Sequence, residues 1–398
     1  MNKILFTVIP EKGHINPYIG VAKHLQQQGY DISFFSPTDI SDQLQQADLN
    51  ITASCLFPAE TSESNRGEIF SKNVQDSIWL RSWIKTLLVD NADHHLLPIQ
   101  AIIEEINPDI IITDPMMYSS AIIANGLNIP WVTISNSLNP VLNNSIKSEL
   151  LETVDWLAKD REKLFSRFKM NVDFKGCDML SPLLSIAFTT EEFAGKADYN
   201  VQLVGSSIPI GKRGDEHYFP WHLLNENQDI VYISFGSQIY HQPKLFKILF
   251  NAIKDKPIQV VATVNELMHS ELLGDIPDNV ILSYYTPQLE LLPKTSVMVT
   301  HGGANSVMEA IYYSVPMLII PLCNDQFHQA HFIEKNDIGI QLNFDRISAE
   351  QCWQAIEKLL VSKNIKNNMK TISKSYKKDG ALEAANLVDS LLKSGVRT

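Results

Sequence analysis

Apolar residues in the first half of the chain form short continuous runs, separated by longer stretches of mixed polarity. Unbroken apolar runs of this length are typical of strands buried on both faces of a parallel sheet, and the stretches between them are long enough for helices. We therefore expect a parallel, doubly wound α/β sheet. The runs are ILFTVIP (4–10), DISFF (31–35), DIIIT (109–113), PWVTIS (130–135), SIAFT (185–189) and VQLVG (201–205).

The helix that follows the first run is expected to begin at about Pro17. Asn16 is a residue type that caps helices, and proline suits the first helical turn because an N–H there has no intrahelical partner. Val21, Ala22 and Leu25 are spaced to face inward from such a helix. The sequence thus predicts a short loop, residues 10–16, between the first strand and the first helix.

The same pattern restarts after 206–222, a stretch with Gly, Pro and mixed charge but no periodicity. We therefore expect two similar α/β domains facing a central cleft: an N-terminal domain over 1–208, a linker over 209–222 and a C-terminal domain over 223–378. A last helix over 379–398 is expected to pack back on the N-terminal domain. The runs of the second half are DIVYISF (229–235), PIQVVAT (257–263), NVILSY (279–284), SVMVT (296–300) and PMLII (316–320).

Composition narrows the class of protein. The 398 residues carry a net charge of −12, which makes a nucleic acid an unfavourable partner. The chain has 4 cysteines, and no two of them form a CxxC pair, which fits a reducing compartment and disfavours a zinc site. The apolar segment near the N-terminus is too short for a signal peptide, and no run is long enough to cross a membrane. We therefore expect a cytoplasmic protein without a transmembrane segment.

Lysines recur at helical spacing along 363–378. Such a stripe is most simply a solvated helix face, and the alternative is contact with an anionic membrane surface. The lysines are Lys363, Lys366, Lys370, Lys374, Lys377 and Lys378.

The stretch VTHGGANSVMEA (299–310) places polar residues directly after a predicted strand. Gly302 and Gly303 let the backbone turn sharply, so a helix can begin near Ala304. The first turn of a helix offers N–H groups and the positive end of the helix dipole, which together favour an anion. Asn305 and Ser306 add side-chain donors. The pattern therefore suits a phosphate group, and a plain capped helix after a glycine turn is the simpler alternative.

Three other strand ends carry polar or aromatic residues. DIVYISFGS ends with Gly236 and Ser237, although the pair GS also occurs in ordinary turns. PMLIIPLCNDQ ends with Asp325 and Gln326, which can bind several hydroxyl groups, and an aspartate there can also cap a helix. SYYTPQ carries Tyr285, which can stack on a flat ring or pack in the core.

In this order, the motifs resemble the donor signature of glycosyltransferase family 1, the nucleotide-sugar-dependent group that includes plant natural-product and bacterial macrolide enzymes. The family pattern W-x-P-Q, H-x-G-x-N-S-x-x-E and D-Q reads here as YTPQ, HGGANSVME and NDQ. The resemblance covers the whole chain, is strongest over 285–326, and implies a GT-B fold. It implies that Tyr285 stacks on uracil and that Glu309 binds ribose. The implied donor set is Gly236, Ser237, Tyr285, Gln288, His301, Gly303, Asn305, Ser306, Glu309, Asp325 and Gln326.

Within that set the resemblance assigns the diphosphate to Ser237, His301, Asn305 and Ser306. It assigns the transferred sugar to Asp325 and Gln326. Three departures from the plant pattern leave two choices open. The nucleotide can be UDP or dTDP, and the sugar can be glucose or another hexose. Tyr285 replaces tryptophan, Ala304 replaces a second tryptophan, and Gln288 lies two residues nearer His301 in the chain.

The family has a catalytic histidine in the motif G-H-x-x-P, and KGHINP places His14 there. Its usual partner is an aspartate after a later strand, and IITDP supplies Asp114. A hydroxyl group must lose its proton as it attacks, and a neutral histidine can accept that proton while the aspartate orients the ring. Taken alone, each residue also has a structural explanation, a loop histidine and a turn aspartate.

The expected function is that of an inverting, metal-independent glycosyltransferase. It would move a hexose, with glucose as the first candidate, from a UDP-sugar to a hydroxyl of a hydrophobic small molecule. No D-x-D motif offers ligands for a metal ion, and no other cofactor is expected. Trp79, Trp83 and Met116 are candidates for the acceptor site, with core packing as the alternative. A nucleotide-sugar epimerase on the same fold and a non-catalytic partner of a transferase are the alternative functions.

Overall fold

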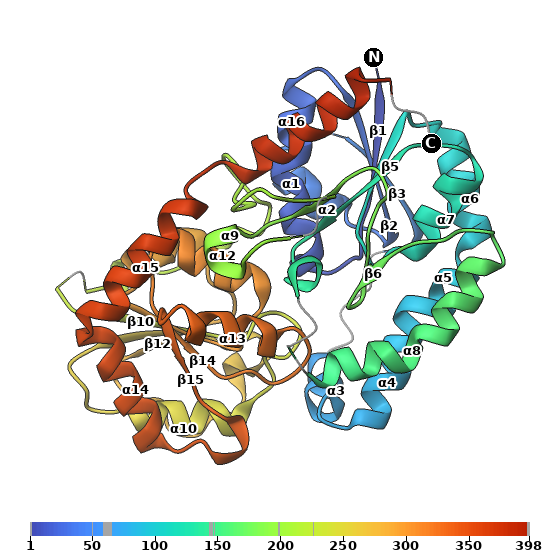
Figure 1. Cartoon of the computed structure of the whole chain (residues 1–398). Coiled ribbons are helices and arrows are strands. Elements are labelled where there is room, and N and C mark those ends of the chain that lie inside the picture. Colours follow the sequence, from blue (N-terminus) through green and yellow to red (C-terminus); the bar gives the residue numbers. More distant parts are fainter. Residues whose placement is uncertain are drawn as a thin grey trace. The chain divides into compact units, whose positions relative to one another are not determined.

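A computed structural model describes residues 2–49, 51–58, 66–142, 146, 148–197, 200–225 and 227–395. The chain forms two compact units that do not follow the order of the sequence. The first unit contains Met1–Thr61, Ser77–Asp215 and Lys378–Thr398, and the second contains Ser62–Asp76 and Glu216–Lys377. Each unit is an α/β domain with its own parallel sheet (Figure 1).

The first unit is built on a seven-stranded sheet with the order β3-β2-β1-β4-β5-β8-β9. All its neighbouring strands are parallel. Its central strands are buried except for Lys3 at the start of β1, which explains their continuous apolar sequence. The strands are β1 (Lys3–Thr7), β2 (Asp31–Thr38), β3 (Thr52–Phe57), β4 (Ile110–Thr113), β5 (Trp131–Ser135), β8 (Ser185–Ala187) and β9 (Val201–Leu203), and a separate hairpin joins β6 (Phe174–Lys175) to β7 (Asp178–Met179).

Helices cover both faces of this sheet. In Figure 1 α1 and α16 lie on one side of the strands, and α6 and α7 lie on the other. The helices of the first unit are α1 (Lys12–Gln27), α2 (Ser41–Gln46), α4 (Ser77–Lys85), α5 (Asn91–His94), α6 (Leu96–Ile106), α7 (Tyr118–Gly126), α8 (Glu149–Ser166), α9 (Glu191–Ala194) and α16 (Gly380–Lys393). The last of these packs along α1, where a Cβ added to Gly20 would lie 2.8 Å from Cβ of Ala381.

The second unit has a six-stranded parallel sheet with the order β12-β11-β10-β13-β14-β15. Its strands are β10 (Ile230–Ser234), β11 (Gln259–Thr263), β12 (Val280–Ser283), β13 (Val297–Thr300), β14 (Met317–Ile319) and β15 (Gly339–Gln341), and its helices are α3 (Arg66–Asn73), α10 (Pro243–Ile253), α11 (Gln288–Leu291), α12 (Ala304–Tyr312), α13 (Gln326–Lys335), α14 (Ala349–Val361) and α15 (Lys363–Tyr376). One core layer joins the sheet to α10 and α14, whose inward residues include Phe246, Phe250 and Ile356.

Both sheets reverse their strand order at an equivalent place. In the first unit, β1 and β4 are neighbours; β2 and β3 follow on the other side of β1, and β5, β8 and β9 follow on the other side of β4. In the second unit, β10 and β13 have the same relation. Ligands of doubly wound sheets bind outside the carboxyl ends of strands at such a switch point. The two expected parallel, doubly wound domains are thus confirmed, and their switch points mark where candidate side chains should gather.

The expected start of the first helix is wrong. Helix α1 begins at Lys12, so His14 lies in its first turn and Pro17 lies inside it. Pro17 has no N–H to donate to the carbonyl of Gly13 four residues earlier, and the side-chain amide of Asn136 donates to that carbonyl instead. A contact distant in sequence therefore lets the helix start earlier than the local signals predict.

Residues 62–76 lie in the expected N-terminal domain by sequence but belong to the second unit. Helix α3 lies in this segment, and its Gly67 lies against the ring of Tyr240 in the loop after β10. The division between the units elsewhere falls after Asp215, within the range taken as a linker. No local sequence signal indicates that α3 belongs to the second unit.

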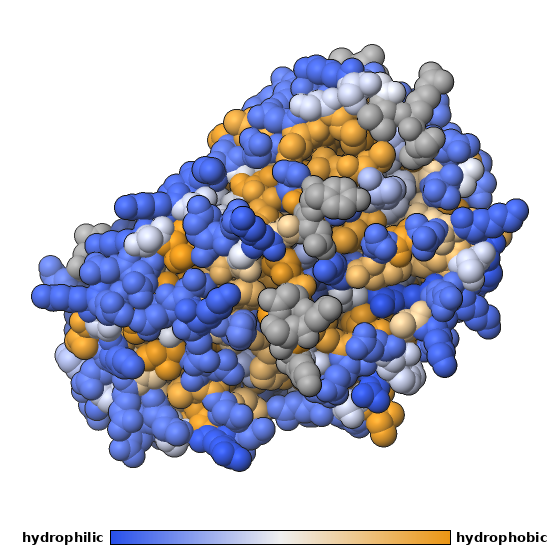
Figure 2. All heavy atoms as spheres, viewed as in Figure 1, coloured by the Kyte–Doolittle hydropathy of each residue, from blue (hydrophilic) through white to orange (hydrophobic). Residues whose placement is uncertain are grey.

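The lysine stripe lies on α15, where Lys363, Lys370 and Lys374 are exposed. Figure 2 shows mainly hydrophilic residues over the part of the surface formed by α14 and α15. None of the helices that the structure describes combines the length and the apolar composition needed to cross a bilayer.

Candidate active site

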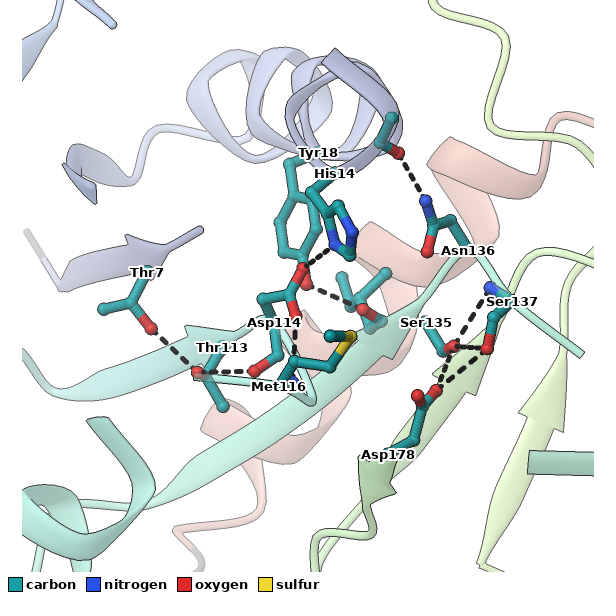
Figure 3. A network of polar contacts seen from close by, with 12 residues as sticks. Thr7, His14, Tyr18, Thr113, Asp114, Met116, Ser135, Asn136, Ser137 and Asp178 are labelled. Carbon is teal, nitrogen blue, oxygen red and sulfur yellow. Dashed lines mark hydrogen bonds and ion pairs between the residues drawn. The ribbon is translucent and has the colours of Figure 1, made fainter. Parts of the chain in front are cut away.

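The carboxyl ends of β1 and β4 bring His14 and Asp114 together. The Nδ1 atom of His14 lies 2.6 Å from Oδ2 of Asp114 (Figure 3). An ionised carboxylate can only accept, so Nδ1 carries the proton of this hydrogen bond, and Nε2 keeps a lone pair whenever the ring is neutral. The side chain of His14 is 23% exposed and that of Asp114 is 2% exposed. The pair therefore presents an oriented imidazole at the edge of the sheet.

The carboxylate of Asp114 is fixed from several sides. Its Oδ1 atom accepts a hydrogen bond from the backbone N–H of Met116 at 2.9 Å, and its own backbone N–H donates to the carbonyl of Thr7 on β1 at 2.8 Å. The hydroxyl of Thr113 donates to the carbonyl of Asp114 at 3.0 Å. The oxygen that faces His14 is thus held without a rearrangement of the loop after β4.

The electrostatics of this pair favour the charged imidazole. Burial alone disfavours the imidazolium form of His14, but the negative charges of Asp114, Glu11 and Asp178 outweigh it and raise the pKa to about 9. Asp114 is the strongest of the three and also accepts the hydrogen bond. At neutral pH most molecules of the free protein therefore carry a protonated His14, and the neutral form becomes abundant only at alkaline pH.

In the second unit, β13 leads into α12 by way of two glycines. Gly302 has a φ of 90°, a conformation that other residues rarely adopt. Gly303 is the N-cap residue of α12 and, as a glycine, supplies no side-chain cap. The half-exposed Asn305 and Ser306 lie in the first turn. The start of α12 therefore has the backbone geometry of an anion site, as the sequence predicts.

The imidazole of His301 lies between Gly236 and Gly303. A Cβ added to Gly236 would lie 2.9 Å from Cε1 of His301, and one added to Gly303 would lie 2.6 Å from Nε2. Burial lowers the pKa of His301 to about 4, although a hydrogen bond with the backbone of Ser234 opposes the shift. His301 is therefore neutral at physiological pH, and the two glycines make the space that it occupies.

The loop after β10 is also held by a residue that the sequence did not single out. Asn265, buried and at a positive φ of 48°, donates a hydrogen bond from its side-chain amide to the carbonyl of Gly236 at 3.1 Å. Ser237, the next residue of that loop, is exposed. The only signal for Asn265 was its residue type, because asparagine tolerates the left-handed conformation.

Glu309 and Gln288 form a polar pair beside the start of α12. The side-chain amide of Gln288 donates to Oε2 of Glu309 at 2.6 Å and lies 3.4 Å from Oγ of Ser306. Glu309 is 1% exposed, so its carboxylate is a buried acceptor on the second turn of α12. This arrangement brings together three members of the expected donor set.

Tyr285, the expected platform for the base, is half-buried and has an aromatic neighbour in His217. The two rings meet edge to face, with centroids 4.7 Å apart and an interplanar angle of 72°. His217 lies in the stretch treated as a linker, where no motif drew attention to it.

Asp325 and Gln326, the expected sugar ligands, differ in their surroundings. Asp325 is the N-cap residue of α13, yet its side chain makes no capping hydrogen bond, so the simple alternative of a capping aspartate is not what the structure has. The carboxamide oxygen of Gln326 accepts from the backbone N–H groups of Leu322 and Cys323 at 2.8 and 3.1 Å. Gln326 therefore holds the loop that carries Asp325, a role that the sequence did not predict.

The acceptor candidates lie in the first unit. Trp79 and Trp83 are half-buried on α4 and stack with their centroids 6.3 Å apart at an interplanar angle of 11°. The side chain of Met116 is half-buried in the turn after Asp114. Among the residues that the structure describes, no group of three or more His, Cys, Asp or Glu side chains is arranged to hold a metal ion.

Comparison with known proteins finds a family model that matches part of the chain and relatives that match almost all of it. Residues 218–386 match the family model described as "UDP-glucoronosyl and UDP-glucosyl transferase". The chain is 26% identical to the uncharacterized UDP-glucosyltransferase YojK of Bacillus subtilis, over 99% of this chain and 98% of the relative. It is 23% identical to the demethyllactenocin mycarosyltransferase of Streptomyces fradiae, over 98% of this chain and 87% of that enzyme.

The fold is similarly shared. The crystal structure of the glycotransferase of kitacinnamycin superposes with a TM-score of 0.78 at 19% identity, covering 98% of this chain and 99% of the other. At this identity the likeness concerns the fold, which is the two-domain GT-B arrangement of parallel sheets. The match therefore agrees with the topology described above.

Proposed function

We propose that this chain is a member of the family of UDP-glucuronosyl and UDP-glucosyl transferases, glycosyltransferase family 1, and that it transfers a hexose, with glucose as the first candidate, from a UDP-sugar to a hydroxyl of a hydrophobic small molecule with inversion of configuration. The observation that carries this proposal is the hydrogen bond of 2.6 Å between His14 and Asp114 at the switch point of the first sheet. The second unit would supply the site for the nucleotide sugar.

In the proposed reaction, His14 is the general base. Its Nε2 atom takes the proton of the acceptor hydroxyl while the hydroxyl oxygen forms a bond to the anomeric carbon. The bond from that carbon to the diphosphate oxygen breaks, and the nucleoside diphosphate leaves with the electron pair. Attack and departure on opposite faces invert the anomeric centre. Asp114 keeps Nδ1 protonated and stabilises the imidazolium that forms.

The second unit would stabilise the departing diphosphate. The first-turn N–H groups of α12 and the side chains of Ser237, Asn305 and Ser306 supply donors, and His301 contributes as a neutral hydrogen-bonding group because burial lowers its pKa to about 4. The positive potential at the diphosphate therefore comes from the helix terminus and backbone dipoles rather than from a charged histidine.

The remaining donor residues would divide the nucleotide and the sugar between them. The buried carboxylate of Glu309, already hydrogen-bonded to Gln288, suits the ribose hydroxyls. Tyr285 would stack on the base, with His217 against its ring. Asp325 would accept hydrogen bonds from the sugar, and Gln326 would act chiefly by holding the loop in place.

The acceptor class follows from the relatives' names and from the surface of α4. One relative is named for transfer to demethyllactenocin, and a structural neighbour is named for kitacinnamycin. The stacked, half-exposed pair Trp79 and Trp83 offers an aromatic surface in the unit that carries His14. We therefore propose a natural-product type of acceptor with an apolar body and at least one hydroxyl group.

A screen of the purified protein tests this function. UDP- and dTDP-sugars are combined with apolar aglycones, and products are identified by mass spectrometry, with their anomeric configuration determined by NMR. The expected product is a β-glycoside from an α-linked donor. A product with retained configuration, or an altered nucleotide sugar formed without an acceptor, would contradict the proposed reaction, and the second result would indicate an epimerase.

The pH dependence of transfer is expected to follow the neutral form of His14. Because the pKa of His14 is raised to about 9, kcat/KM should rise about tenfold for each pH unit between 6 and 8 and level off near 9. In Asp114→Asn the carboxylate that favours imidazolium is gone, so the pKa of His14 falls and the profile levels off at lower pH. Initial rates across this range provide the measurement, and a wild-type profile that is flat from pH 6 to 9 would contradict the assignment.

Transfer is also expected to be independent of added metal ions. The candidate diphosphate donors are N–H groups and hydroxyls that are fixed by the fold, and preorganised donors of this kind can replace a cation. Turnover in excess EDTA should equal turnover without EDTA. Activity that disappears in EDTA and returns with magnesium or manganese would show that a divalent ion performs this role.

A further inference from the structure

The first turn of α1, which carries His14, is held from a second direction besides Asp114. Pro17 cannot donate to the carbonyl of Gly13, and the side-chain amide of Asn136 donates to it across from the loop after β5. Figure 3 shows this contact beside the ring of His14. Because Gly13 directly precedes His14, the amide of Asn136 fixes the backbone from which the imidazole extends.

The segment that carries Asn136 is itself anchored. Ser135 and Ser137, its neighbours on both sides, donate from their hydroxyls to the same oxygen, Oδ2, of Asp178, the latter at 3.2 Å (Figure 3). The side-chain amide of Asn139 donates to Oδ1 of Asp178 at 2.8 Å. Asp178, at the start of β7, is 1% exposed. One buried carboxylate thus binds three side chains from the end of β5 and the loop that follows it.

Burying the carboxylate of Asp178 costs free energy, and its hydrogen bonds to the three side chains offset part of that cost. Burial raises its pKa to about 6, hydrogen bonds from Ser135 and Asn139 act against that shift, and the charge of Asp114 adds to it. It is also one of the carboxylates that favour the imidazolium form of His14. The position is therefore coupled to His14 both by the chain of contacts and by charge.

We propose that Asn136 is a positioning residue for His14, and that the buried carboxylate of Asp178 holds the loop segment through which Asn136 acts. The frame formed by Asn136 and Asp178 fixes the helix turn, and Asp114 fixes the ring, so both are needed for the short contact between His14 and Asp114. The inference rests on the proposed function only for its effect on transfer; its effect on the ionisation of His14 is independent of any substrate.

The variant Asn136→Leu tests the proposal, because leucine has a similar size and no N–H donor. NMR titration of histidine-labelled protein, with His14 assigned by comparison with His14→Ala, gives the ionisation midpoint without substrates. We expect a wild-type midpoint near 9 and a downward shift of about one unit or more in the variant. Turnover should fall about 10-fold to 100-fold with little change in KM for the donor, since the base is displaced while the donor site is intact.

Matched variants separate positioning from general damage. Asn125→Leu changes an exposed asparagine on α7 in the same unit and should leave both readouts at wild-type values. Asn136→Gln retains the donor and should recover part of the lost turnover. Asp178→Asn should lower the midpoint as well, and if it does not fold, Ser137→Ala removes one contact of the same anchor.

An unchanged His14 midpoint in folded Asn136→Leu would overturn the proposal, whether or not turnover falls. A lowered midpoint that Asn136→Gln does not restore at all would also overturn it. If the wild-type protein shows no transfer to any acceptor, the proposed function fails, and the midpoint comparison still decides whether Asn136 positions His14.

Discussion

Replacing His14 by alanine is expected to lower turnover by about 100-fold to 10,000-fold, the range typical for loss of a general base. The affinity for free UDP should stay near that of the wild type, because His14 lies in the first unit and the residues of the expected donor set lie in the second. Turnover is measured by product formation at saturating donor, and UDP affinity by calorimetry.

The matched control for this variant is His94→Ala, which removes an exposed histidine of α5 in the same unit. It should behave as the wild type in both measurements. An acceptor with an already ionised hydroxyl should lose less rate in His14→Ala than an ordinary alcohol does. Transfer to an ordinary alcohol within threefold of the wild type would contradict the role of His14.

The second large effect is expected from His301→Ala. Removal of one preorganised donor to a developing charge costs about 10-fold to 1,000-fold in turnover in comparable sites. The variant also leaves a space between Gly236 and Gly303, both of which now lie against the imidazole. UDP affinity should fall with turnover here, in contrast to His14→Ala, because His301 would contact the part of the donor that remains in UDP.

His301→Gln and His269→Ala serve as the comparisons. Glutamine can place an N–H group near the position of Nε2 and should restore part of the activity, whereas the exposed His269 is expected to be replaceable without loss. The pH profile between 6 and 9 should keep its shape in His301→Ala, because a group with a pKa of about 4 does not titrate in that range. If kcat/KM in His301→Ala no longer rises between pH 6 and 9, the titrating base would be His301 and not His14.

The sequence predicted the central strands of both sheets because buried parallel strands must be apolar at every position. It missed β3 and β15, which lie at the edges of their sheets; β3 contains only exposed and half-buried residues. The hairpin of β6 and β7 was missed as well, since strands of two residues leave no periodic pattern. Apolar runs therefore identified the buried central strands and also β9 and β12, which are only partly buried, but not the exposed edge strand β3 or the two-residue strands.

The candidate site was predictable where its residues follow strands directly. His301, Gly303 and Asp114 lie there, so a motif or a strand end points to each of them. The supporting residues were not predicted. Asn136 also follows a strand directly, but Asn136, Asp178 and Asn265 act by contacts between segments distant in sequence, which a single sequence does not reveal. Likewise the helix start predicted at Pro17 followed local rules but was wrong, because the side-chain amide of Asn136 satisfies the carbonyl of Gly13 that Pro17 cannot.

The packing of α16 along α1 has a consequence for how the protein is made. Tyr30, just after α1, donates a hydrogen bond to Asp389 of α16 at 2.6 Å, and Ala381, Ala384 and Val388 are fully buried. A ribosome releases the N-terminal part of a protein first, and domains generally fold in that order as synthesis proceeds. Here the first unit cannot cover its own apolar helix until residues 380–393 have left the exit tunnel, which happens only after the whole second unit has emerged. During translation α1 therefore stays partly uncovered until α16, which is synthesised after the second unit, becomes available to pack against it.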